Sequence, residues 1–392
     1  MTTTIKNEHK KLNVPNSTDE GNAIRNVPHL RFPEFEGKWK ECKFGDIATG
    51  FDYGMNAAAK TYDGINKYIR ITDIDEASST YTDKDVVSPD GVLTDNYLVN
   101  DCDILLARTG ASTGKSYLYK KSDGKLYYAG FLIRANVTTH DPYFVFSQLH
   151  THRYWRWVSI MSARSGQPGI NSQEYSSFPI YTTSIEEESK IAKLLSLLDE
   201  RISNQSKIID KLQTLIKGIA QNIARNNRPN IRISECLECS SSTLQESDVC
   251  EHGTYPVYGA NGIVGYLDNY NTEGEAIYII KDGSGVGTVS YVTGKCSGTG
   301  TLNTLQTKKG YSLQYLYYML KVFSFDSYKT GMAIPHIYFK DYGKAKIFCP
   351  SYTEQLQYAR LLSAIDSKLS AEQIFLTNLS LQKQYLLRQM FI

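Results

Sequence analysis

A glycine-rich segment after an apolar run carries residue types that hold phosphate groups. It reads Gly110-Ala-Ser-Thr-Gly-Lys-Ser116, and Arg108 and Thr109 separate it from the apolar stretch of residues 104–107. A nucleotide-binding phosphate loop needs four residues between its glycines, and here three separate them. We therefore expect a tight turn that presents Arg108, Ser112 and Lys115 to an anion such as a DNA phosphate.

A second segment, residues 164–171, has side chains suited to reading bases. It contains Arg164, Gln167 and Asn171. Arginine pairs in bidentate fashion with guanine, and the amides of glutamine and asparagine pair with adenine. A plain loop before a strand is the alternative. Weaker counterparts in the second half of the chain are Lys281, Ser284, Lys329, His336 and Lys340.

Metal and catalytic signatures are weak. Cys236 and Cys239 have zinc-ligand spacing, but Cys250 and His252 form an irregular second pair, so unbound thiols are favoured over a structural zinc. The segment from Asp141 to Phe144 has one proline where an amino-methyltransferase has two. A nuclease would have to combine Pro89-Asp90 with the distant Glu188-Ser-Lys190. Serine-hydrolase and zinc-protease motifs are absent, so we expect no catalysis and no cofactor in this chain alone.

The element that must position these segments is a long helix expected over residues 184–222. Its apolar residues recur at the heptad spacing of a helix that packs lengthwise on another helix. One row starts at Ile191 and is interrupted only at Gln205, and the other starts at Leu195. The core residues predicted from this spacing in the first helix are Leu195, Leu198, Ile202, Ile209 and Leu212.

The chain contains this helix twice. The stretch IAKLLSLLDERIS, which begins at Ile191, aligns with YARLLSAIDSKLS, which begins at Tyr358, and the polar break of the second copy is Glu372. The core residues predicted there are Leu362, Ile365, Leu369, Leu376 and Leu379. Fainter similarity aligns residues 104–114 with 277–287, and residues 165–167 with 330–332. The repeat therefore covers a globular domain plus a helix, although Gln205 and Glu372 would meet in either a parallel or an antiparallel pair.

Composition and the positions of turn-forming residues predict the domain organisation. The 392 residues are 41% hydrophobic and 21% charged with a net charge of +2, so any anionic partner must be met by local patches. We expect a flexible tail at 1–26, mixed α/β domains at 27–183 and 226–350, and long helices at 184–225 and 351–392. The first domain is expected to contain a single helix near residues 142–159. Scattered cysteines and the absence of a secretory signal or a membrane span predict a cytoplasmic location.

The combination of these features resembles the specificity subunit of a type I restriction-modification enzyme. The resemblance rests on PHLRFPEFEGKW (28–39), YPVYGANGIVGY (255–266), the segment at 165–171 and the duplicated helices. It implies an α+β fold with two target-recognition domains, a pseudo-twofold repeat, and long helices packed as an antiparallel coiled coil. Each domain would read half of a bipartite DNA site, and a helix of about 38 residues would span roughly 57 Å, or about 17 base pairs.

The resemblance also implies partners. Two modification subunits would bind S-adenosylmethionine and methylate adenine, and restriction subunits would bind ATP and Mg²⁺. The chain itself would bind double-stranded DNA, no membrane and no cofactor. The alternative is a non-catalytic scaffold whose tyrosine-rich domains bind carbohydrate or protein and whose helices only oligomerise.

The heptad interpretation gives a direct test. Replacing Ile202 and Ile209 with Asp should separate the helices and abolish assembly with the modification subunit, because two charges would be buried in the apolar seam. A change at Arg164 should instead alter sequence choice and leave assembly intact. Co-purification with the modification subunit is the measurement, and normal assembly of the Asp variant would show that the heptad interpretation is wrong.

Overall fold

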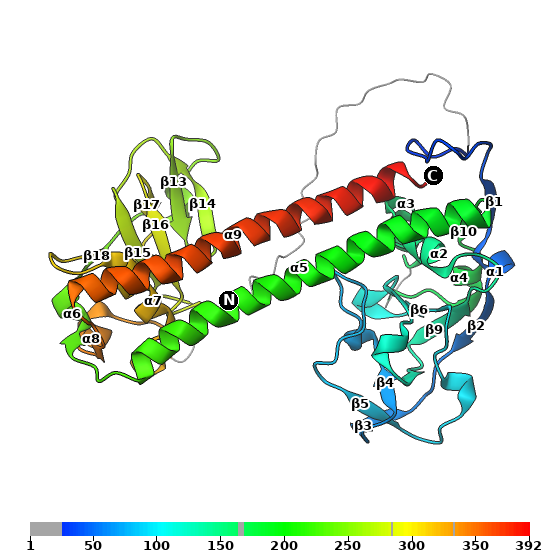
Figure 1. The fold of residues 1–392 in the computed structure, drawn as a ribbon, viewed down its shortest axis with the longest axis horizontal. Coiled ribbons are helices and arrows are strands. Elements are labelled where there is room, and N and C mark those ends of the chain that lie inside the picture. The colour runs from blue at the N-terminus through cyan, green and yellow to red at the C-terminus, as the bar shows by residue number, and fades with distance from the viewer. Residues whose placement is uncertain (1–25, 164–167, 284, 332–333) are drawn as a thin grey trace. The chain divides into compact units, whose positions relative to one another are not determined.

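A computed structural model describes residues 26–163, 168–283, 285–331 and 334–392. The chain divides into two compact units, Met1–Arg201 with Leu379–Ile392, and Ile202–Asn378. The division falls within both long helices, α5 (Ile185–Arg225) and α9 (Tyr352–Gln389), so each unit contains part of each helix (Figure 1).

The first unit is built on a four-stranded antiparallel sheet in the order β2-β9-β6-β7. The central strand β6 is buried along its whole length because its side chains alternate between two cores. Ile104 and Leu106 point into one core, and Leu105 and Ala107 point into the other. These strands are β2 (Thr49–Tyr53), β6 (Asp103–Ala107), β7 (Ser116–Leu118) and β9 (Leu132–Asn136).

Shorter elements surround this sheet. The paired strands are β1 (Lys40–Lys43) with β10 (Pro179–Thr182), β3 (Ala58–Thr61) with β5 (Val87–Asp90), and β4 (Lys67–Ile69) with β8 (Leu126–Tyr128). The short helices are α1 (Phe44–Ile47), α4 (Ser172–Ser176), η1 (Ile71–Asp73), η2 (Asp95–Tyr97), η3 (Gly110–Ser112) and η4 (Lys121–Asp123). The single helix expected near residues 142–159 is wrong: Thr151 ends it and caps a second one, giving α2 (Pro142–Gln148) and α3 (His152–Met161).

The second unit repeats the same plan. Its main sheet has the order β12-β18-β15-β16, and β15 again alternates between two cores, with Ile277 and Ile279 in one and Tyr278 in the other. Its strands are β11 (Ile231–Arg232), β12 (Leu237–Ser241), β13 (Tyr255–Gly259), β14 (Gly262–Leu267), β15 (Glu275–Ile280), β16 (Val289–Thr293), β17 (Ser297–Gly298), β18 (Leu302–Thr307) and β19 (Lys346–Ile347). Its short helices are α6 (Ile233–Cys236), α7 (Leu313–Val322), α8 (Phe339–Tyr342), η5 (Glu246–Asp248) and η6 (Asp326–Tyr328).

The long helices pack antiparallel within each unit, as the resemblance implied. In the second unit, Ala220 and Ile223 near the end of α5 share a core with Ala359 and Leu362 near the start of α9. In the first unit, Met390, directly after α9, shares a core with residues near the start of α5. Each helix has two heptad rows, which start at Ile191 and Leu195 in α5 and at Tyr358 and Leu362 in α9. With five positions to a row, all twenty are buried or half-buried.

Residues repeated between the helices attach each one to its own domain. Glu188 and Gln355 occupy equivalent positions in the two helices. The side chain of Glu188 accepts a hydrogen bond of 3.1 Å from the backbone amide of Asp141, the N-cap residue of α2, and the side chain of Gln355 accepts one of 2.9 Å from that of Ser312, the N-cap residue of α7. The repeated aspartate does the same with a tyrosine hydroxyl: Tyr143 donates to Asp199 and Tyr318 donates to Asp366. The aspartate shared by the two helices is therefore a contact with the domain in each unit.

The segment 28–39 closes the first unit over both helices. Arg31 forms an ion pair of 2.7 Å with the buried Glu187 of α5, and the amide of Leu30 donates to the carbonyl of Gln389 in α9. Trp39 is 1% exposed and packs edge-on against Phe144 and Phe391. The core of this unit thus combines residues from both ends of the sequence.

This closure predicts that Phe391→Ala will destabilise the first unit by about 3 kcal/mol, because a buried aromatic side chain is lost. Chemical denaturation followed by tryptophan fluorescence measures it, since all three tryptophans lie in this unit. Tyr385→Ala is the matched control, because Tyr385 lies near the end of α9 with 56% of its side chain exposed, and its loss should cost less than about 0.5 kcal/mol. Equal effects of the two changes would refute the closure.

Candidate nucleic-acid interface

The glycine-rich loop of the first unit is a tight turn at the end of β6. The amide of Ala107 donates to the carbonyl of Lys115 at 2.8 Å, and the amide of Gly114 donates back to Ala107 at 3.0 Å. Gly114 has a φ of +94°, and a Cβ there would lie 2.8 Å from the side chain of Val158 in α3. A residue without a side chain is therefore needed where the loop passes α3.

The segment after residue 167 pairs with this loop. The amide of Gly110 donates to the carbonyl of Pro168 at 3.0 Å, and the amide of Ile170 donates to the carbonyl of Arg108 at 2.9 Å. The two segments singled out in the sequence, around Arg108 and before Asn171, are thus adjacent in space. Arg164 and Gln167 lie outside the described residues.

The second unit builds the same structure with different side chains. The amide of Gly283 donates to the carbonyl of Pro335 at 3.0 Å, and the amide of Ile337 donates to the carbonyl of Lys281 at 2.9 Å. Lys281 therefore takes the place of Arg108, and Pro335 takes the place of Pro168. The residues of our alignment of 165–167 with 330–332 lie largely outside the described part of the chain, so that alignment stays a prediction. Ser284 lies outside the described residues.

Several of the predicted DNA-binding side chains already have protein partners. Lys115 is 3.3 Å from the exposed carboxylate of Glu76, Lys329 is 2.7 Å from Asp326, and the Nδ1 of His336 is 3.3 Å from Asp282. Ser112 is half-buried within η3. Because the partners of the two lysines are exposed, their ion pairs are weak and can be exchanged for contacts with phosphate.

Asn171 has a structural role. Its side-chain oxygen accepts from the amide of Glu174 at 2.9 Å, and its own amide donates to the Glu174 carboxylate at 2.8 Å, which is a capping box at the start of α4. A bidentate pair with adenine needs the same side-chain oxygen. The structure therefore favours a helix cap over base recognition at this position.

Sequence reasoning missed the aromatic surroundings of Arg108. The guanidinium lies 4.8 Å from the ring centroid of Tyr53 and 6.0 Å from that of Phe131. These residues come from β2 and from the turn before β9, and they meet Arg108 only when the sheet forms. No spacing in the sequence marks them.

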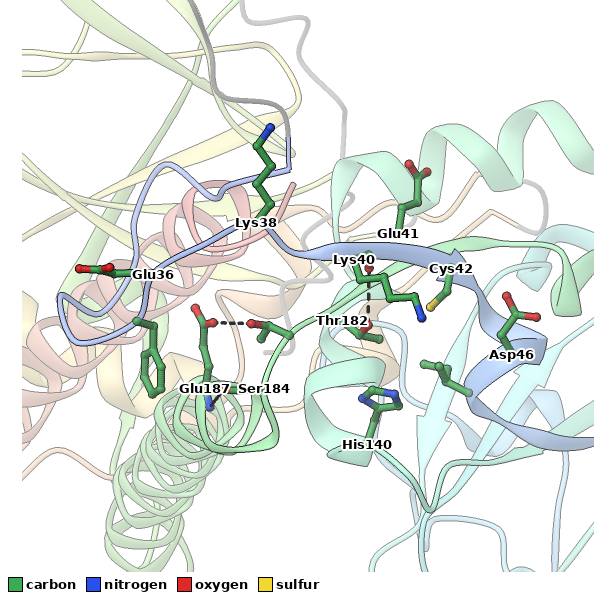
Figure 2. A pocket seen from close by; sticks show the side chains of 13 residues that line it. Glu36, Lys38, Lys40, Glu41, Cys42, Asp46, His140, Thr182, Ser184 and Glu187 are labelled. Atoms are coloured by element: carbon green, nitrogen blue, oxygen red, sulfur yellow. Dashed lines mark hydrogen bonds between the residues drawn. The ribbon is translucent and has the colours of Figure 1, made fainter.

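A cavity of about 780 Å³ lies apart from these loops, between β1, β10 and the start of α5 (Figure 2). Its lining mixes the two cations Lys38 and Lys40 with four carboxylates, so it offers no net attraction for a phosphate backbone. Burial raises the pKa of the Cys42 thiol in this lining, which makes it a poor nucleophile at neutral pH. The charged residues that line the cavity are Glu36, Lys38, Lys40, Glu41, Asp46 and Glu187, together with His140.

The described part of the chain lacks both a metal-binding cluster and a membrane-spanning helix. It contains no group of three or more acidic, histidine or cysteine side chains that could hold a metal ion, and Cys236 is buried whereas Cys250 is exposed. None of its helices is long and apolar enough to cross a bilayer.

Known proteins share this sequence pattern and this fold. The pattern of the type I restriction modification DNA specificity domain matches residues 36–214 and 230–376. The specificity subunit of the EcoprrI type I restriction enzyme of Escherichia coli is 24% identical over 175 residues, 45% of this chain and 39% of that protein. A putative type I specificity subunit of Mycoplasma genitalium is 24% identical over 233 residues, 54% of this chain and 61% of that protein. The matched regions thus span less than two thirds of either relative.

Solved structures extend the likeness to almost the whole chain. The S subunit of a type I restriction-modification system from M. genitalium superposes with a TM-score of 0.67 and 19% identity, covering 93% of this chain and 99% of that one. A chain from a structural study of complex assembly and conformational transition in a type I system gives a TM-score of 0.50 at 14% identity, covering 90% and 97%. At these identities the superpositions show the fold, and the sequence pattern shows the family. The resemblance found in the sequence is thereby confirmed, and the chain belongs to the family of type I restriction modification DNA specificity domains.

Proposed function

We propose that this chain is the DNA sequence-recognition subunit of a type I restriction-modification complex and catalyses no reaction itself. Each domain would read one half of a bipartite target. The observation that carries the proposal is the repeated loop: in both units the same backbone hydrogen bonds hold a basic residue, Arg108 or Lys281, at the end of the central strand. Equivalent scaffolds with different side chains suit two readers of different sequences.

The helices would supply the frame and the docking sites. With 41 and 38 residues they are long enough to separate two readers by about 57 Å, or roughly 17 base pairs. Two modification subunits would dock on equivalent surfaces of the pseudo-twofold frame, and restriction subunits would join them. S-adenosylmethionine, ATP and Mg²⁺ would be bound by these partners, and the complex would act in the cytoplasm on double-stranded DNA.

The salt dependence of DNA binding tests the proposal. We expect the affinity of the complex of this chain with its modification subunit to fall steeply as salt rises from about 50 to 200 mM, because bound phosphates release counterions. Lys115→Gln should lower the slope of log K against log salt by about one, which is the loss of one phosphate contact. Fluorescence anisotropy with a labelled duplex measures both quantities.

Lys121→Gln is the matched control. Lys121 follows β7 of the same hairpin, at the end opposite Lys115, and its side chain is 80% exposed. The Lys121→Gln variant should leave the slope of log K against log salt unchanged. Absence of DNA binding by the complex at low salt would refute the proposed function.

A further inference from the structure

Arg108 is held more tightly than a phosphate contact requires. Its backbone amide donates to the carbonyl of Phe131 at 3.1 Å, and its carbonyl accepts from Ile170 at 2.9 Å. Its side-chain Nε donates to the carbonyl of Gly130 at 3.0 Å. Both the position of the residue and the direction of its guanidinium are therefore set before any ligand binds.

Aromatic rings flank the guanidinium and also face solvent. Tyr53 is 44% exposed and Phe131 is 60% exposed, although both are large rings next to a folded sheet. The hydroxyl of Tyr53 accepts from the amide of Ser172 at 3.2 Å, which fixes the ring beneath Arg108. Exposed rings complement the apolar parts of bases, such as the methyl group of thymine, better than they complement a charged phosphate.

The bond to Gly130 uses Nε and leaves the two terminal nitrogens, Nη1 and Nη2. Within the described residues, neither of them has a hydrogen bond or an ion pair to protein. Two adjacent donors of this geometry match the O6 and N7 acceptors of guanine. Since the side chain is already ordered, little conformational entropy is lost when it pairs.

We propose that Arg108 reads a guanine in the major groove of the half-site bound by the first domain, an inference that rests on the proposed function. Strand register shows that the second domain lacks this arrangement at the equivalent position. Lys281, Ser241 and Thr301 stand where the first domain has Arg108, Tyr53 and Phe131. Lysine is a point donor without the bidentate geometry, and the flanking rings are missing.

The test uses the full chain in complex with its modification subunit. Methylome mapping in cells that carry both proteins gives the target sequence. Duplexes are then made in which each guanine of the target in turn is replaced by 7-deazaguanine, which lacks the N7 acceptor. Binding of the wild-type complex should weaken at one guanine of one half-site. The loss should be about 10- to 100-fold relative to the unmodified duplex.

Arg108→Lys keeps the charge and removes the bidentate geometry. The variant should bind the unmodified target about as weakly as the wild type binds the duplex with 7-deazaguanine at the sensitive position. Replacing that guanine with 7-deazaguanine should not weaken binding by the variant any further. Its methylome should become degenerate at the same base pair. Tyr53→Leu, at an exposed position, should relax the same base pair to a smaller extent and serves if Arg108→Lys fails to fold. Lys115→Gln should weaken all duplexes equally and leave the methylated motif unchanged.

Three results would overturn the inference. A uniform loss of affinity for every duplex in Arg108→Lys would mean that Arg108 contacts a phosphate. If the methylated motif of Arg108→Lys is unchanged, Arg108 reads no guanine. The same conclusion follows if the wild-type complex tolerates 7-deazaguanine at every guanine of the target. Failure of the proposed function is distinct, because the wild-type complex would then bind no duplex and produce no methylated motif.

Discussion

The antiparallel pairing of α5 and α9 is the constraint on which the rest of the structure depends. Neither globular core is complete without it. In the first unit the end of α9 places Met390 and Phe391 against Trp39, and in the second unit the end of α5 places Ala220 and Ile223 against the domain. A parallel pair could not deliver these ends to these cores. The helices and the domains therefore fold as joint structures within each unit.

Polar residues at the seam give this pairing its register. Gln205 is 5% exposed and donates to the backbone carbonyl of Glu372 at 3.1 Å, and Lys383 is 2.6 Å from Asp199. A buried polar residue costs stability unless it meets its partner, so a shift along the seam would leave both pairs unsatisfied. Burial and the neighbouring Asp199 raise the pKa of Tyr143, which keeps its hydroxyl protonated as the donor to that carboxylate. The Asp199 carboxylate of α5 thus contacts both Tyr143 of the first domain and Lys383 of α9.

The helices were predictable from the sequence because heptad spacing reports one-dimensional packing directly. The limits 185–225 and 352–389 differ from the predicted 184–225 and 351–392 by at most three residues at either end. Orientation was not predictable, since the polar breaks at Gln205 and Glu372 lie near the middle of each helix. The predicted helix over 142–159 was wrong because its apolar pattern continues through Thr151, whose side chain ends one helix and caps the next.

The candidate site, like the helices, was predictable from the sequence only in part. The glycine-rich turn was predictable because glycine and strand residues are local signals, and its pairing with the segment after Pro168 was not, since that contact forms across the fold. The aromatic rings around Arg108 could not be predicted because Tyr53 lies on β2 and Phe131 lies in the turn before β9, and they meet Arg108 only when the sheet forms. Asn171 was singled out for its chemistry, which a capping box at the start of α4 engages instead.

The central claim is that one pair of helices sets the distance between two DNA readers. The most direct test inserts one heptad into α5 and one heptad into α9 at the position that faces the first insertion. The methylated sequence is then mapped. Seven residues add about 10.5 Å, which corresponds to about three base pairs. The account predicts unchanged half-sites separated by a longer unread gap. Unchanged half-sites with a gap of the original length would contradict it.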